Sequence, residues 1–127
     1  MRVLLVEKNP LELEAMRLGL DAPDLDIEVS TDGDRALTRA LKEPPRVVVT
    51  TSSLGQMGGF ALSRELKTLH ERGDLPEVAV IVLLERSVDS WLADWSRCDA
   101  HRTKPVDLVE LESLVRQLGT QAQPTAV

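Results

Sequence analysis

Residues 103–108 read Thr103-Lys104-Pro105-Val106-Asp107-Leu108 and lie between a short apolar segment and the last amphipathic segment of the chain. Asp107 and Glu110 have capping-box spacing, so a helix is expected to begin directly after Lys104-Pro105. The chain opens with Arg2-Val3-Leu4-Leu5-Val6, an apolar run that ends at once in charged residues. These two ends predict a fold in which strands and helices alternate.

Short apolar runs bounded by turn residues predict five strands. They are Val3–Val6, Ile27–Val29, Val47–Val49, Val78–Leu84 and a weaker segment at 99–103. The third and fourth runs are continuously apolar, which is typical of central parallel strands covered by helices on both faces.

Helix patterns with recognisable ends separate these runs. The first starts at Asn9-Pro10 and runs to about Leu20, the second starts at Thr31 or Asp32 and stops at Pro44-Pro45, and the third follows Gly58-Gly59 and ends near Gly73. Ser87 is expected to cap a fourth helix with Val88, Trp91, Leu92 and Trp95 on one face, and the fifth runs from Asp107 to Gly119. Five strand-helix units in series predict an α/β fold with a doubly wound parallel sheet.

The composition is that of a single soluble domain. The chain has 127 residues, of which 43% are hydrophobic and 28% charged, enough for one buried core. We expect a domain over residues 1–119, and a tail or linker stub over 120–127, where no apolar period continues.

Charge and targeting signals exclude several classes of function. A net charge of -6 with scattered Lys and Arg argues against direct binding of nucleic acid. No segment is long enough to span a bilayer, and Val3–Val6 is too short for a secretory signal. Cys98 is the only cysteine, which excludes an intramolecular disulfide and a zinc thiolate cluster. A cytoplasmic protein without membrane contact is expected.

Chemistry in an open parallel α/β sheet gathers where the strands end. Those ends read Glu7-Lys8, Thr51-Ser52-Ser53, Leu84-Glu85 and Thr103-Lys104-Pro105. Together with the Thr31-Asp32-Gly33 turn and the Met57-Gly58-Gly59-Phe60 loop, they make residues 2–118 resemble the receiver domains of two-component response regulators. The resemblance implies a flavodoxin-like (βα)5 sheet in the order 2-1-3-4-5 and a role in bacterial signal transduction.

The working residues of that family transfer to this sequence one by one, and most are altered. The paired acids fall on Glu7 and Lys8, and the phospho-accepting aspartate falls on Thr51. The switch Ser/Thr falls on Leu84 and the aromatic switch position on His101. The phosphate-pairing lysine alone is retained, as Lys104. The resemblance therefore implies a degenerate pseudo-receiver.

Phosphoryl transfer in this family needs a carboxylate nucleophile and Mg²⁺ bound by carboxylates. Thr51 offers no carboxylate, and Glu7, Lys8 and Lys104 together give the pocket a formal charge of +1. An extra positive charge beside a divalent ion costs several kcal/mol even at an effective dielectric of ~20. We expect no magnesium, no other cofactor and no enzymatic activity.

Other roles are expected for the residues that remain. We expect Lys104 to form a salt bridge with Glu7, and Pro105 resembles the cis-proline of the family. Lys8 either points to solvent or places its ammonium where the metal would be. Leu84 has no hydroxyl to be drawn toward a phosphoryl group, so it would pack permanently in one conformation.

Two other ways of switching stay open. The first is a receiver that uses Glu7 or Thr51 as an unconventional acceptor, including phosphorylation of Thr51 by a Ser/Thr kinase. The second is a pocket that binds a small anion or another ligand beside its lysines.

The two tryptophans lie one helical turn apart. Trp91 is expected in the core and Trp95 on the surface, as a contact for a protein partner. His101 is expected to be a half-buried replacement for the lost aromatic side chain. The face formed by the fourth helix, fifth strand and fifth helix is the expected partner surface, with a homodimer as one option.

Overall fold

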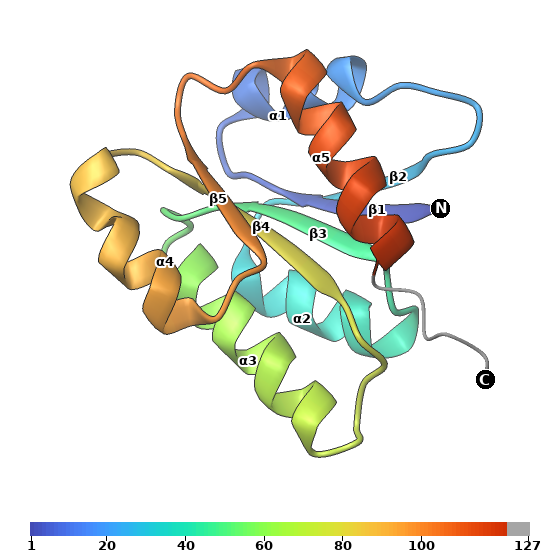
Figure 1. Cartoon of the computed structure of the whole chain (residues 1–127), viewed down its shortest axis with the longest axis vertical. Coiled ribbons are helices and arrows are strands. Elements are labelled where there is room, and N and C mark those ends of the chain that lie inside the picture. Colours follow the sequence, from blue (N-terminus) through green and yellow to red (C-terminus); the bar gives the residue numbers. More distant parts are fainter. Residues whose placement is uncertain (122–127) are drawn as a thin grey trace.

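Five parallel strands form the centre of the computed structural model, which describes residues 1–121 (Figure 1). The strands are β1 (Arg2–Val6), β2 (Asp26–Ser30), β3 (Val47–Thr51), β4 (Ala79–Leu84) and β5 (Ala100–Thr103). They pair in the order β2-β1-β3-β4-β5. The predicted doubly wound sheet and its strand order are confirmed.

Helices follow the strands and cover both faces of the sheet. They are α1 (Pro10–Gly19), α2 (Gly33–Lys42), α3 (Gly59–Glu71), the 3-10 turn η1 (Ser87–Asp89), α4 (Ser90–Ser96) and α5 (Leu108–Gln121). Figure 1 shows α1 and α5 on one face of the sheet, and α2, α3 and α4 on the other. Among residues 1–121, no helix has both the length and the apolar character needed to span a bilayer.

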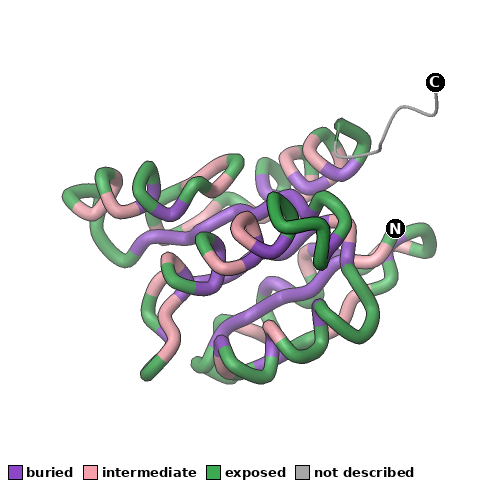
Figure 2. Tube along the Cα trace, turned by 90° about the horizontal axis from the view of Figure 1, so that it is seen from below, coloured by how far each residue is buried: buried purple, intermediate pink, exposed green. Residues whose placement is uncertain are grey.

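The strands are buried because both of their faces pack against helices. Successive side chains point to opposite faces of a strand, so Leu4 packs with the α2 and α3 layer while Leu5 packs with the α1 and α5 layer. β3 and β4 are buried along their whole length, and Figure 2 shows this as purple segments through the middle of the molecule. The prediction that these two apolar runs form central strands covered on both faces is therefore confirmed.

Side-chain caps fix where three of the helices begin. The Asn9 side-chain oxygen accepts hydrogen bonds from the backbone N–H groups of Leu11 and Glu12, at 2.9 and 3.2 Å. Asp32 and Asp107 cap α2 and α5 in the same way. Such caps satisfy N–H groups that have no partner within the helix. The cap at Asn9 places Glu12 in the first turn of α1, next to the end of β1.

Two helix boundaries differ from the prediction. Ser87 does not cap α4 but begins η1, and α4 starts at Ser90. α5 passes through Gly119 to Gln121, and Gly119 is buried within the helix beside the side chain of Met1. The remainder of the expected tail, 122–127, lies outside the described residues.

Trp91 of the fourth helix points outward, contrary to the prediction, whereas Trp95 is exposed as expected. Trp91 is 64% exposed and was expected in the core, and Val88 is 65% exposed. The buried residues of α4 are the small Ala93 and Ser96. The Ser63 hydroxyl of α3 donates a hydrogen bond of 3.0 Å to the Ser96 carbonyl. Small residues permit this close approach of α3 and α4, which leaves the bulky face of α4 to solvent.

Gly59 allows α3 to start against the end of β3. Its backbone N–H donates to the Ser52 carbonyl at 3.0 Å. A Cβ at this position would lie 2.1 Å from the Thr51 carbonyl oxygen. Since that neighbour is backbone, no side-chain rotation relieves the overlap, and the close approach requires glycine.

Gly59→Ala should therefore destabilise the domain by about 3 kcal/mol or more, because the start of α3 must move away from β3. Gly55→Ala is the matched control. It has open space around the new Cβ but a φ of +97°, which costs about 1 kcal/mol in an L-residue. Urea unfolding followed by circular dichroism measures both, and equal losses of stability would contradict this account of Gly59.

Candidate functional site

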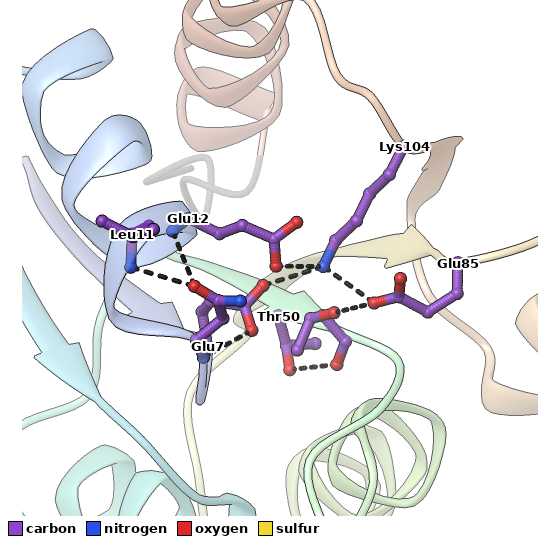
Figure 3. A network of polar contacts seen from close by, with 8 residues as sticks. Glu7, Leu11, Glu12, Thr50, Glu85 and Lys104 are labelled. Atoms are coloured by element: carbon purple, nitrogen blue, oxygen red, sulfur yellow. Dashed lines mark hydrogen bonds and ion pairs between the residues drawn. The ribbon is translucent and has the colours of Figure 1, made fainter.

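The site is built around the ammonium group of Lys104, in the loop between β5 and α5. The backbone N–H of Lys104 donates to the Leu84 carbonyl at 2.8 Å, which places the lysine beside the end of β4. Its Nζ lies 2.8 Å from Glu7 Oε1, 2.8 Å from Glu85 Oε1 and 3.1 Å from Glu12 Oε2. Figure 3 shows the three carboxylates pointing toward this nitrogen from different segments.

Glu7 is the buried member of the group. It follows β1 directly, and only 2% of the residue is exposed. One carboxylate oxygen pairs with Lys104, and the other accepts a hydrogen bond of 3.1 Å from the backbone N–H of Asn9. A buried carboxylate is tolerated only when it is paired and hydrogen-bonded. The predicted Glu7–Lys104 salt bridge is confirmed, and both oxygens of Glu7 have partners.

Thr51 closes the other side of the site. The residue is fully buried, and its hydroxyl donates a hydrogen bond of 3.2 Å to Glu85 Oε1. The same Glu85 oxygen pairs with Lys104. Glu85 thus holds the residue at the acceptor position and the retained lysine together.

The charges of Lys104 and Glu85 stabilise each other. Burial alone would lower the pKa of Lys104, but hydrogen bonds with Glu7, Glu85 and Glu12 outweigh it and raise the pKa above its usual value. The hydrogen bond from Lys104 lowers the pKa of Glu85, against a smaller opposing effect of burial. Lys104 is therefore an ammonium and Glu85 a carboxylate at neutral pH.

The charge of the site is more negative than the sequence suggested. Glu12 and Glu85 join Glu7, so three carboxylates face the ammonium groups of Lys104 and, further out, Lys8, a formal charge of -1 rather than +1. Lys8 is exposed and acts on Glu85 only through its charge. Of the two lysines, Lys104 rather than Lys8 lies among the carboxylates.

The residues present do not fit the magnesium ion that the receiver resemblance implies. Mg²⁺ requires oxygen ligands at about 2.0–2.1 Å in near-octahedral geometry. Here each of Glu7, Glu12 and Glu85 is already bonded to the Lys104 ammonium. Within residues 1–121, no group of three or more His, Cys, Asp and Glu side chains is placed to hold a metal ion. The cause is this internal cation rather than the net positive charge first expected.

The two switch positions are both occupied by side chains fixed in the fold. Leu84 is fully buried, in the cluster that includes Leu62 and Ala93. His101 is half-buried on β5 and lines a groove of about 560 Å³ between the end of α4 and α5. The Lys104–Pro105 peptide is cis, as the resemblance implied.

Trp95 is tied to α3 although it is 48% exposed. Arg64 donates to the Trp95 carbonyl at 2.7 Å, and its guanidinium lies 4.7 Å from the centre of the ring. This is the geometry of a cation–π contact. Trp95, Trp91 and Val88 are all exposed, and these three residues of η1 and α4 are here called the tryptophan strip.

Comparison with known proteins decides the family. No protein-family model matches the chain. A response regulatory protein of Mycobacterium tuberculosis is 32% identical over 103 residues, which cover 80% of this chain and 74% of that protein. The chain belongs to the response-regulator receiver family. The response regulator PmrA of Pseudomonas aeruginosa is 30% identical over 118 residues, 93% of this chain and 52% of PmrA.

Solved structures of receiver domains have the same fold as this chain. The signal receiver domain of a histidine kinase from Syntrophus aciditrophicus superposes with a TM-score of 0.85 at 26% identity, covering 99% of this chain and 96% of that one. The predicted receiver resemblance is therefore confirmed.

Glu12 and Glu85 are the site residues that sequence reasoning missed. Glu85 stood at a strand end, next to Leu84, but the family comparison gave that position no role. Glu12 lies in the first turn of α1, a position to which the family comparison also gave no role. Both could have been found by asking which carboxylates lie within reach of a retained lysine whose usual aspartate partner is absent.

The lowered pKa of Glu85 makes part of the stability depend on pH. Its carboxylate stabilises the fold above its unfolded-state pKa of about 4.3, and this contribution is lost as the pH falls through the lower folded-state pKa. Glu85→Gln should cost about 0.5–1 kcal/mol at pH 7, since Glu85 is partly exposed, and almost nothing at strongly acidic pH. Urea unfolding across this range measures the difference, with the exposed Glu77→Gln as control. A pH-independent difference would contradict the ion pair.

Proposed function

We propose that this receiver domain is a phosphorylation-independent protein-interaction module in bacterial signalling. The observation that supports it most directly is the position of Thr51, which is buried where the family has its acceptor aspartate and is hydrogen-bonded to Glu85. A neutral hydroxyl is a poor acceptor unless a base takes its proton, and the Glu85 carboxylate that accepts this hydrogen bond is a weak base, because its hydrogen bond with Lys104 lowers its pKa.

The contacts of the site also weigh against an unconventional acceptor. Glu7 is 2% exposed and uses both carboxylate oxygens, so it is not free to attack a phosphoryl donor. Thr51 is fully buried, which keeps it from the active site of a Ser/Thr kinase. An entering anion would have to displace carboxylates from Lys104. No observation favours either alternative.

The tryptophan strip is the proposed contact for a protein partner. Trp91 is 64% exposed, and Val88 and Trp95 lie on the same side of η1 and α4. Exposed tryptophans are enriched among the residues that dominate binding energy. A groove lined by His101 and Leu114 lies between the end of α4 and α5. The partner is a cytoplasmic protein or a second copy of this chain.

Phosphorylation independence is tested by two-dimensional NMR spectra recorded before and after addition of Mg²⁺ with beryllofluoride, which mimics a phosphoryl group. We expect no saturable shifts at Glu7, Thr51 or Lys104, because the site has no acceptor carboxylate and no free lysine. A receiver with an intact aspartate serves as the positive control. Saturable shifts that extend to Leu84 and His101 would sink the proposal.

Partner binding is tested by Trp91→Ala. Proteins captured from the source organism are identified, and the affinity of the purified partner for wild type and variant is measured by calorimetry. The variant should bind at least about tenfold more weakly, a loss of roughly 1.4 kcal/mol, at unchanged stability. Leu18→Ala removes an apolar side chain of similar exposure, 60%, from α1 on the other face of the sheet, and should leave the affinity unchanged. Equal affinities for Trp91→Ala and wild type would rule out the tryptophan strip.

A further inference from the structure

The outer edge of β2 is open. β2 stands at one end of the sheet, and within residues 1–121 only β1 pairs with it. The backbone N–H of Asp26 and the carbonyl of Ser30 bond to the residues that flank β1. In a parallel ladder every second residue bonds to the same neighbouring strand. Ile27 and Val29 therefore turn their N–H and C=O groups away from β1, toward the open side.

The residues of β2 do not block a second strand. Proteins commonly protect an exposed edge with proline, lysine or a bulge. The five residues of β2 include neither proline nor lysine, and their register with β1 is unbroken. The carboxylates of Asp26 and Glu28 are paired with Arg2. Val29 is 38% exposed, so an apolar residue lies at this edge.

A groove of about 710 Å³ runs between β2 and α2. Most of the charged side chains that line it already have ion-pair partners: Glu28 with Arg39, Arg35 with Asp32, and Glu43 with Arg2. Two of them have none in the part of the chain that the structure describes, Asp34 in the first turn of α2 and Lys42 in its last. The unpaired charges of the groove are therefore opposite in sign and stand at opposite ends of α2.

We propose that β2 pairs with β2 of a second copy of this chain, antiparallel and about a two-fold axis, so that the two sheets become one. An axis at Glu28 sets Ile27 of each copy opposite Val29 of the other. Each of these pairs exchanges its N–H and C=O groups, as hydrogen-bonded pairs of antiparallel strands do. The backbone groups that one copy leaves open at β2 are then used, and the two-fold pair is closed to further copies.

The side chains of β2 fit this arrangement. Ile27 packs on the layer of α1 and α5, and Val29 lies on the same face because side chains alternate along a strand. Pairing places Ile27 of one copy beside Val29 of the other, an apolar cross-strand contact. The two Glu28 carboxylates meet near the axis, and each is held by Arg2 and Arg39 of its own chain. Their charges are therefore balanced.

The unpaired charges of α2 favour a second copy over another protein. Arg39 pairs with Glu28 at 3.1 Å, so the middle of α2 lies level with the centre of β2. Asp34 and Lys42 stand on one side of the helix, about 12 Å apart and on either side of this level. A two-fold axis at Glu28 reverses α2, and Asp34 of each copy then faces Lys42 of the other. A two-fold interface requires a surface that is complementary to itself in this way.

This contact lies apart from the tryptophan strip. The strip belongs to η1 and α4, which follow β4, whereas the dimer contact belongs to β2 and α2. The inference goes beyond the proposed function and does not rest on it. Loss of partner binding in Trp91→Ala would leave the dimer intact.

The test is sedimentation velocity over a range of protein concentrations at low ionic strength. Wild type should form dimers. Asp34→Lys and Lys42→Asp should each raise the dissociation constant of the dimer at least about tenfold, because like charges then face each other at both ends of the contact. The double variant exchanges the two charges and should restore the dimer. Glu77→Lys reverses an exposed charge outside the groove and, as the control, should dimerise like wild type.

Val29→Pro tests the backbone bonds separately. It removes the outward N–H of Val29, a group that no bond between β2 and β1 uses. The variant should be monomeric, with the circular dichroism spectrum of wild type. If it does not fold, Val29→Lys replaces it, because an edge lysine also opposes strand pairing.

Three results would overturn the proposal. They are a wild type that stays monomeric, a double variant that dimerises no better than the single ones, and a dimer that is lost in Trp91→Ala but kept in Asp34→Lys. The first of these would assign the open edge to an extended segment of another protein instead.

Discussion

A buried carboxylate needs a positive partner, and in this domain the ion pair between Glu7 and Lys104 meets that need. Glu7 directly follows the interior strand β1, with 2% of the residue exposed. Removing one partner of such a buried pair typically costs about 3–5 kcal/mol, because the other charge is left uncompensated. Lys104 therefore has a structural role, because it balances the charge of the buried Glu7. Its position in turn fixes the loop between β5 and α5.

The same ion pair organises the polar groups of the pocket. Lys104 is shared among three carboxylates, and the hydroxyl of Thr51 is bonded to one of them. Each polar group that a phosphoryl donor or metal ion would need already has a partner in the protein. The fully buried Leu84 adds no hydroxyl that could respond to an event in the pocket.

The strands and most helix boundaries could be predicted from sequence, because apolar runs such as Val47–Val49 and caps such as Asn9 act locally. The strand order was implied only by the resemblance to receiver domains. The orientation of α4 could not be predicted. Its apolar residues have helical spacing, which favours an apolar face in the core. The side that packs against α3 instead carries the small Ala93 and Ser96, and Trp91 faces outward. The continuation of α5 past Gly119 was also not predicted, because a glycine after an apolar period commonly ends a helix, whereas here Gly119 is buried within α5 beside Met1.

At the site, the sequence predicted the pair of Glu7 and Lys104 but not its other members. Glu12 and Glu85 are separated from Lys104 by 92 and 19 positions, so only the folded chain brings them together. Without them the charge of the pocket was given the wrong sign. A family comparison assigns roles only to positions the family uses, which is why Glu85, beside the switch position, received none.

The state of the Lys104 ammonium tests this account most directly. Nitrogen-15 NMR of the lysine side chains detects an ammonium whose hydrogens exchange slowly because they are held in hydrogen bonds. The account predicts that the Lys104 ammonium remains protonated and slowly exchanging at pH values where exposed lysines exchange rapidly, and that its signal is unchanged by Mg²⁺ and beryllofluoride. Rapid exchange at Lys104, or a shift on adding these ions, would contradict it.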